Sequence, residues 1–179
     1  MVDPDLDLVD RALSGDTEAF SELVQKYQKP IYYTALRMLA EHEDAADIAQ
    51  QTFINAFRAL LTFKRQASFK TWIYQIAINL CRNCIKERTR KPRFQDIEEV
   101  EMVDGKPMPF DRLNESSHAD LVSQAIGRLP DQQRTSVILR VYQEYSYEQI
   151  ADTLGCSKAT ARVHYHHGIR SLRKMMEGI

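Results

Sequence analysis

The segment from Asp44 to Leu60 constrains the fold most, because small and apolar residues recur on one helical face for about four turns. These residues are Ala45, Ile48, Ala49, Thr52, Phe53, Ala56, Phe57 and Leu60. Such a stripe predicts an amphipathic helix with one buried face. Stripes of the same period follow Asp16 and run from Phe69 to Cys84, and helical segments lie on both sides of Pro130. No segment alternates with the period of a strand, so the sequence predicts an all-α fold.

Prolines predict where two of these helices begin or end. Pro30 suits the first turn of a helix, so we expect the helix after Asp16 to stop and a second one to begin at Pro30. The helix that contains Phe69 should fail by Pro92, because the residue before a proline avoids helical dihedral angles.

Residues 91–115 have no hydrophobic period, contain several prolines and are rich in acids. This composition predicts a solvated, flexible tether. We therefore expect two small helical domains joined by a flexible linker. The N-terminal helical bundle would occupy residues 1–90, and a C-terminal helix-turn-helix domain would occupy residues 116–179.

The composition is that of a soluble globular protein, with 44% hydrophobic and 27% charged residues. The opening segment MVDPDLDLVD is acidic where a secretory signal needs a basic region, and no apolar run approaches the roughly 20 residues of a membrane span. Three cysteines do not make a disulfide framework. We expect a cytoplasmic protein with no membrane insertion.

The charge is unevenly distributed although the formal net charge is only −1. Basic residues dominate from Arg82 to Arg93, and only basic charges occur from Lys158 to Lys174, with the acidic segment between them. Two separated basic patches indicate two modest contacts with a polyanion.

The segment YEQIADTLGCSKATARVHY has the spacing of a helix-turn-helix, with Ala151, Gly155 and Ala161 at the positions that need a small residue, a turn and a packed side chain. Ser146 and Gln149 form a capping-box pattern, and Ser157 can cap the second helix. A purely structural helical hairpin is the alternative, because such hairpins also end in glycine. The basic flanks favour a DNA reader.

In a reader, the second helix would enter the major groove of duplex DNA with its first turns. Arg162 would suit a bidentate contact to guanine, whereas Lys158, Arg170 and Arg173 would suit phosphates. The candidate residues are Ser157, Lys158, Ala159, Thr160, Arg162, Val163, His166, Arg170 and Arg173.

Two clusters could instead indicate metal or redox chemistry. Cys81 and Cys84 have CxxC spacing, but both fall on an apolar helical stripe and no second ligand pair follows, so core packing is the favoured interpretation. His164 and His167 share a helix face with His166 nearby and Cys156 upstream, but DNA contact or packing is favoured over a metal site. No catalytic constellation or cofactor motif is evident, so we expect neither an enzyme nor a cofactor.

The segments EDAADIAQQTFINAFRALLTFKRQASFKTWIYQIAINLCRN and LPDQQRTSVILRVYQEYSYEQIADTLGCSKATARVHYHHGIRSLRK resemble the N-terminal and C-terminal domains of bacterial extracytoplasmic-function sigma factors. The resemblance implies a subunit that joins core RNA polymerase and recognises promoter DNA. It implies that the outward face of the helix around DIAQQTF binds the clamp helices of the polymerase's largest subunit. That face carries Asp47, Gln50, Gln51, Ile54, Asn55 and Arg58.

The resemblance also implies that a loop and the helix after it recognise the −10 element as a single strand. That function needs a base-sized pocket beside a basic track. The loop candidates are Phe63, Lys64, Arg65 and Ser68, and the helix candidates are Gln75, Asn79, Arg82, Asn83 and Lys86. For Phe69 and Trp72, which lie on the apolar stripe, core packing is the preferred interpretation. The C-terminal reader would bind the −35 element as duplex.

Several residues depart from the family pattern. Gln51 stands where the family more often has Glu, and Asn83 and Lys86 where it commonly has Asp and Arg. The family commonly has Arg at the position of His164 and Val at that of Ala161. The reader helix therefore keeps its geometry with less charge. Because of Asn83 and Lys86, promoter preference cannot be copied from relatives.

Other expectations rest on the family as well. An anti-sigma partner is expected to hold the protein inactive, the free chain is expected to be monomeric, and the acidic linker either is a plain tether or threads through the polymerase. The alternative function is an autonomous regulator that binds duplex DNA through its C-terminal domain, with the N-terminal domain as a sensor or dimerisation unit.

Overall fold

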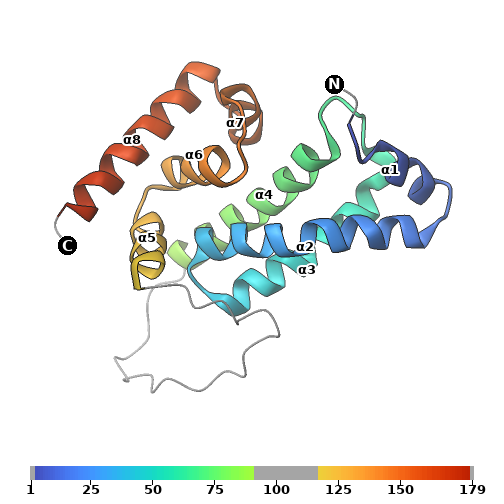
Figure 1. Cartoon of the computed structure of the whole chain (residues 1–179), viewed down its shortest axis with the longest axis horizontal. Helices are drawn as coiled ribbons and strands as arrows, with labels where there is room; N and C mark the ends of the chain where they lie inside the picture. Colours follow the sequence, from blue (N-terminus) through green and yellow to red (C-terminus); the bar gives the residue numbers. More distant parts are fainter. Residues whose placement is uncertain (1–2, 91–116, 178–179) are drawn as a thin grey trace.

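The computed structural model describes residues 3–90 and 117–177. Within these ranges the chain forms eight α-helices, one short 3-10 helix and no strand, which confirms the all-α class (Figure 1). In chain order they are α1 Leu6–Leu13, α2 Thr17–Leu39, α3 His42–Ala59, η1 Leu60–Thr62, α4 Phe69–Arg90, α5 Ser117–Gly127, α6 Asp131–Tyr142, α7 Tyr147–Leu154 and α8 Lys158–Met176. The predicted linker, residues 91–115, lies outside the described residues.

Helices α1 to α4 form the N-terminal bundle. The carboxylate of Asp16 accepts hydrogen bonds from the backbone N–H groups of Glu18 and Ala19, so it caps α2 as the sequence predicts. Helix α2 packs against α1, α3 and α4. The residues that it buries completely include Leu23, Ile31 and Met38.

The expectation of a helix boundary at Pro30 is wrong, because α2 continues without a break from Thr17 to Leu39. Pro30 lies on the exposed side, where water can satisfy the carbonyl that loses its backbone donor. The buried stripe of Tyr27, Ile31 and Thr34 continues across the proline. Packing of this stripe outweighs the local cost of the proline.

Helix α1 is an element that the sequence analysis did not predict. Val9 is fully buried in the core, and Leu6, Leu8, Ala12 and Leu13 are partly buried against that core. With only eight residues, α1 depends on this tertiary packing for its stability.

Helices α5 to α8 form the C-terminal domain. Helix α8 packs against α5, α6 and α7, and α6 supplies a buried run from Thr135 to Leu139. Gly168 allows α8 to approach α6 closely, since a Cβ atom there would lie 2.7 Å from Cγ2 of Val137.

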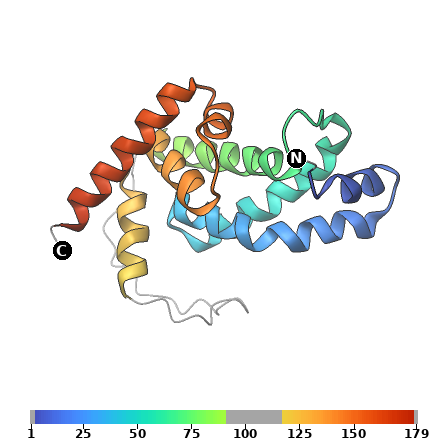
Figure 2. The ribbon, with the colours of Figure 1, turned by 45° about the horizontal axis from the view of Figure 1, so that its top comes forward.

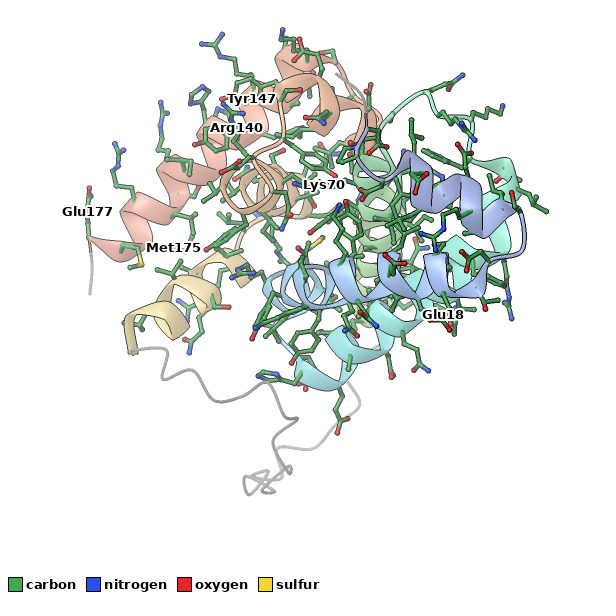
Figure 3. All side chains as sticks on the ribbon, turned by 45° about the vertical axis from the view of Figure 1, so that its right-hand side comes forward. Glu18, Lys70, Arg140, Tyr147, Met175 and Glu177 are labelled. Carbon is green, nitrogen blue, oxygen red and sulfur yellow. The ribbon has the colours of Figure 1, made fainter. Side chains whose placement is uncertain are left out.

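The two domains pack directly against each other, with α6 and α7 beside α4 in both ribbon views (Figures 1 and 2). Tyr145, only 2% exposed, packs its ring edge-on against that of Tyr74 at 6.0 Å between centroids. Lys70, labelled in Figure 3 where the domains meet, donates to the carbonyl of Gln143 at 3.2 Å. Arg134 donates to the carbonyl of Met38 at 2.6 Å. The C-terminal domain therefore contacts both α2 and α4.

In the described ranges, none of the helices combines the length and the apolar character needed to span a bilayer.

Candidate nucleic-acid interface

Helices α7 and α8 form the predicted helix-turn-helix. Ser146 and Gln149 make the reciprocal capping box at the start of α7. Gly155 has φ +65°, the left-handed conformation that ends α7 with least strain in glycine. The Ser157 hydroxyl then accepts from the backbone N–H of Thr160, which caps α8. Ala161 is fully buried, so α8 lies close to its neighbours at that turn.

The first turns of α8 face solvent. All nine residues predicted to contact duplex DNA are exposed. They are Ser157, Lys158, Ala159, Thr160, Arg162, Val163, His166, Arg170 and Arg173. Among the basic ones, Lys158 forms an exposed ion pair with Glu148 of α7. Arg162, Arg170 and Arg173 form no salt bridge with the described carboxylates. The helix therefore presents cations from its first turn to its last.

The histidines of α8 do not converge on one point. His166 and His167 are exposed, whereas His164 is partly buried and its Nε2 lacks a hydrogen-bond partner within the described structure. The ring of His166 lies 5.4 Å from that of Tyr165. Among residues 3–90 and 117–177, no three His, Cys, Asp or Glu side chains are placed to hold a metal ion.

The loop before α4 is built on an aromatic cluster. Phe63 is 7% exposed, and its ring lies 5.1 Å from Trp72 and 6.1 Å from Phe69. Its position corrects the expectation that Phe63 lines an open base pocket, because the cluster covers its ring faces. Phe69 is fully buried, in line with the core interpretation.

The remaining loop candidates lie at the surface. Lys64 and Arg65 are exposed, and Arg65 has φ +56° and forms an ion pair with Asp10 of α1. Ser68 is partly buried and accepts from the backbone N–H of Thr71 at 3.1 Å, so it caps α4. The loop therefore exposes two cationic side chains next to the packed aromatic cluster.

The polar side of α4 is partly open and partly covered. Asn79, Asn83 and Lys86 are exposed, and Gln75 is half-buried. Arg82 donates from Nε to Oδ2 of Asp131 in α6 at 2.9 Å, with 19% of its side chain exposed. One of the five candidate residues of α4 is thus paired with the other domain.

The residues predicted to bind polymerase lie on the outward side of α3. Asp47, Gln50, Gln51 and Arg58 are exposed, Asn55 is partly buried and Ile54 is 37% exposed. The Gln51 amide donates to the Asn55 carbonyl oxygen at 2.8 Å.

Sequence reasoning missed the apolar part of this surface. Phe57 was expected to be buried but is 55% exposed, and Leu61 is 85% exposed. A groove of about 380 Å³ opens between α2 and α3. Its lining includes Val24, Tyr33 and Phe53, together with Gln50 and Ile54. Exposed aromatic and aliphatic side chains and an open groove indicate a binding surface, and helical periodicity alone does not predict them.

Cys81 and Cys84 lie on the core side of α4. Cys81 is fully buried, and burial raises the pKa of its thiol to about 12. Burial also raises the pKa of Cys84. Both thiols are therefore protonated near neutral pH, which is the opposite of a reactive or metal-binding thiolate.

The geometry defines a class of protein: a two-domain helical chain with an exposed reader helix and a second polar and apolar surface on the other domain. Comparisons with known proteins identify the family. Residues 23–91 match Sigma-70 region 2, and residues 119–172 match Sigma-70, region 4. The chain is 33% identical to the RNA polymerase sigma-H factor of Pseudomonas aeruginosa, with 97% of this chain and 94% of that protein covered. It is 32% identical to the ECF RNA polymerase sigma factor SigW of Bacillus subtilis, with 92% of each covered.

Solved structures agree with this fold. The structure of CnrH in complex with the cytosolic domain of CnrY has a TM-score of 0.73 at 21% identity and covers 97% of both chains. That of the sigma factor RpoE from Bartonella quintana with the anti-sigma factor NepR has a TM-score of 0.70 at 22% identity, covering 88% of this chain and 96% of that one. The chain belongs to the sigma-70 family, as an extracytoplasmic-function sigma factor. It is thus an alternative sigma factor of transcription initiation.

Proposed function

We propose that this sigma factor uses three separate surfaces: α3 for core polymerase, the loop and polar side of α4 for the −10 element, and α8 for the −35 element. The observation that carries the proposal is the exposed first half of α8, which follows the Gly155 turn in a helix-turn-helix. Catalysis would rest with the polymerase.

For polymerase binding, α3 offers a polar face next to an apolar one. Asp47 and Arg58 supply charges at its two ends, and Ile54 and Phe57 supply exposed apolar area between them. Stable interfaces combine a desolvated apolar centre with a polar rim. The surface of α3 has both parts, which supports a helical partner such as the polymerase clamp.

For the −10 element, the loop supplies exposed cations and the helix that follows it, α4, supplies exposed amides. Lys64 and Arg65 would track the backbone of the strand, and Asn79 and Asn83 can donate to and accept from an unstacked base. Phe63, Phe69 and Trp72 would act from beneath as a rigid support.

For the −35 element, Arg162 projects from the second turn of α8, where a reader helix contacts base edges. Arg170 and Arg173 lie further along and suit phosphates. With only a few cations on its exposed side, this helix would bind duplex weakly by itself. Polymerase binding would supply the remaining affinity.

The two domains pack against each other in this structure, and they have to separate before the −10 and −35 elements can be bound at the same time. Elements centred about 25 base pairs apart are separated by about 85 Å of duplex at 3.4 Å per base pair. Here α7 packs on α4 and α6 packs on α2, and Arg82 of α4 is paired with Asp131 of α6. Residues 91–116, if extended, could span up to about 90 Å. We propose that polymerase binding separates the domains, with this segment as a plain tether or threaded through the polymerase.

An anti-sigma factor is the expected regulator. RpoE of Bartonella quintana is solved with the anti-sigma factor NepR, and this chain shares its fold. We propose that the present protein is held inactive by a partner of that kind, is monomeric when free of partners, and resides in the cytoplasm.

Site-specific photo-crosslinking in the reconstituted holoenzyme tests this assignment. A crosslinker at Asn79 should capture the −10 strand only where the DNA is open, and one at Val163 should capture −35 duplex. A matched crosslinker at Asp152, exposed on α7, serves as the control. Capture of the same DNA positions from Asn79 and Asp152 would contradict the assignment.

A further inference from the structure

Helix α1 is tied to the rest of the N-terminal bundle by carboxylates. Asp5 is 1% exposed and accepts hydrogen bonds from the Tyr27 hydroxyl and the Lys26 ammonium group. Asp3 accepts from the backbone N–H of Phe69 at 2.7 Å, at the first turn of α4. Together with the buried Val9, these contacts fix α1 relative to the start of α4.

Helix α1 places Asp10 next to the loop that is proposed to contact the backbone of the −10 strand. Both guanidinium NH₂ groups of Arg65 donate to the Asp10 carboxylate, one of them at 3.4 Å. The two side chains are about half exposed, at 46% for Arg65 and 53% for Asp10. The neighbouring loop cation, Lys64, has no salt bridge to a described carboxylate. The charge of Arg65 is thus neutralised by Asp10, whereas that of Lys64 is not neutralised by a described carboxylate.

An exposed ion pair exchanges readily with other anions, because water and salt screen it. A phosphate of the strand and the carboxylate of Asp10 therefore compete for the same guanidinium. The backbone of Arg65 is also in the left-handed region, at φ +56°, which is uncommon for a residue with a side chain.

Resting on the function proposed above, we propose that Asp10 is a positioning residue that withholds Arg65 from the strand and so limits sequence-independent binding at the −10 element. With Asp10 in place, contacts from the polar side of α4 contribute a larger share of the affinity. Without it, Arg65 gains a phosphate contact that carries no sequence information.

The test compares Asp10→Asn with Asp7→Asn in the reconstituted holoenzyme. Asp7 lies on the same helix, is exposed and has no salt bridge in the described structure, so both variants change the net charge equally. Binding to single-stranded oligonucleotides is measured against salt concentration. One oligonucleotide carries the −10 sequence enriched by the holoenzyme, and the other is a scrambled version of it.

Asp10→Asn should steepen the slope of log K against log salt by about 0.7, the change for one more phosphate contact on single-stranded DNA. It should also lower the ratio of −10 to scrambled affinity, whereas Asp7→Asn should change neither. In the Arg65→Ala background, the difference between the two variants should disappear. Equal slopes for both variants, with strand selection intact, would overturn this inference alone. A holoenzyme that selects no −10 strand would overturn the proposed function, and this inference with it.

Discussion

Arg82 of α4 and Asp131 of α6 form a partly buried ion pair that joins the two domains, with 2.9 Å between Arg82 Nε and Asp131 Oδ2. Arg82 is a residue that the proposed function assigns to DNA, so the pair links domain closure to access at α4. The buried Tyr74 and Tyr145 rings lie in the same interface.

Replacing Asp131 should therefore open the molecule. Asp131→Asn should weaken the interface by about 1 kcal/mol, since a partly buried pair lies at the upper end of the range for exposed pairs. That change shifts the open population roughly fivefold. Single-molecule energy transfer between dyes on α2 and α8 would report it. Asp152→Asn, with the same charge change at an exposed position of α7, is the control, and identical distributions for the two variants would refute the prediction.

If α3 binds polymerase as proposed, exchanging its charges should weaken binding without any change of net charge. Asp47→Lys with Arg58→Glu reverses the charge pattern of the helix and leaves the total unchanged. Core polymerase should bind this variant at least about tenfold more weakly, or about 1.4 kcal/mol, as measured by fluorescence anisotropy of the labelled chain.

A second charge exchange provides the control for α3. Asp152→Lys with Lys174→Glu also preserves the net charge, but both residues lie on the exposed surface of the C-terminal domain. It should bind core polymerase nearly normally. An unaltered affinity in the α3 variant would place the polymerase contact elsewhere.

Substitutions of two arginines in α8 should affect DNA binding in different ways. Arg162→Ala should cost about 1–3 kcal/mol on the preferred −35 sequence and relax the preference at one base position. Arg170→Ala should weaken binding to all sequences evenly and lower the salt slope by about 1. Selection of DNA by each holoenzyme, followed by sequencing, separates the two outcomes. An unchanged base preference for Arg162→Ala would remove this residue from the reader.

Buried Cys81 predicts a loss of stability at alkaline pH. Its pKa is raised from an ordinary value of 9.0 to about 12 in the folded chain, because burial disfavours the thiolate. Above pH 9 the unfolded chain loses this proton and the folded chain keeps it, so stability is intact below pH 9 and falls as pH rises towards 12.

The expected loss is about 1.4 kcal/mol per pH unit from this group. Urea unfolding at pH 8, 9 and 10 measures it. Cys81→Ala is less stable throughout but should decline less between pH 9 and 10. The contribution of Tyr74 starts later, because its ordinary pKa of 10.0 is higher than that of cysteine, and burial raises it to about 12. Parallel declines for the variant and the parent would contradict the assignment to Cys81.

The sequence predicted the elements whose signals are local. Asp16, Ser146, Gln149 and Ser157 cap the helices that their positions indicated, and Gly155 ends α7. Capping and turn chemistry depends on residues within one turn, so it can be read directly from the chain.

Features that depend on packing could not be predicted in this way. The periodicity of α3 placed Phe57 on the buried face, but the ring of Phe20 in α2 covers it only in part and leaves it 55% exposed. Tyr74 and Ile78 lie off the predicted stripe of α4 and are buried because the C-terminal domain packs there. Pro30 is tolerated inside α2 for the same reason, since tertiary burial outweighs local preference.

Reconstituted transcription tests the central claim most directly. Purified core polymerase would be supplied with a pool of promoter-containing DNA, with and without this chain, and the transcript start sites would be sequenced. Initiation at a defined set of sites that requires this chain, together with weak promoter binding by the chain alone, is the predicted result. Tight promoter binding without polymerase, and no chain-dependent initiation, would contradict it and indicate an autonomous regulator.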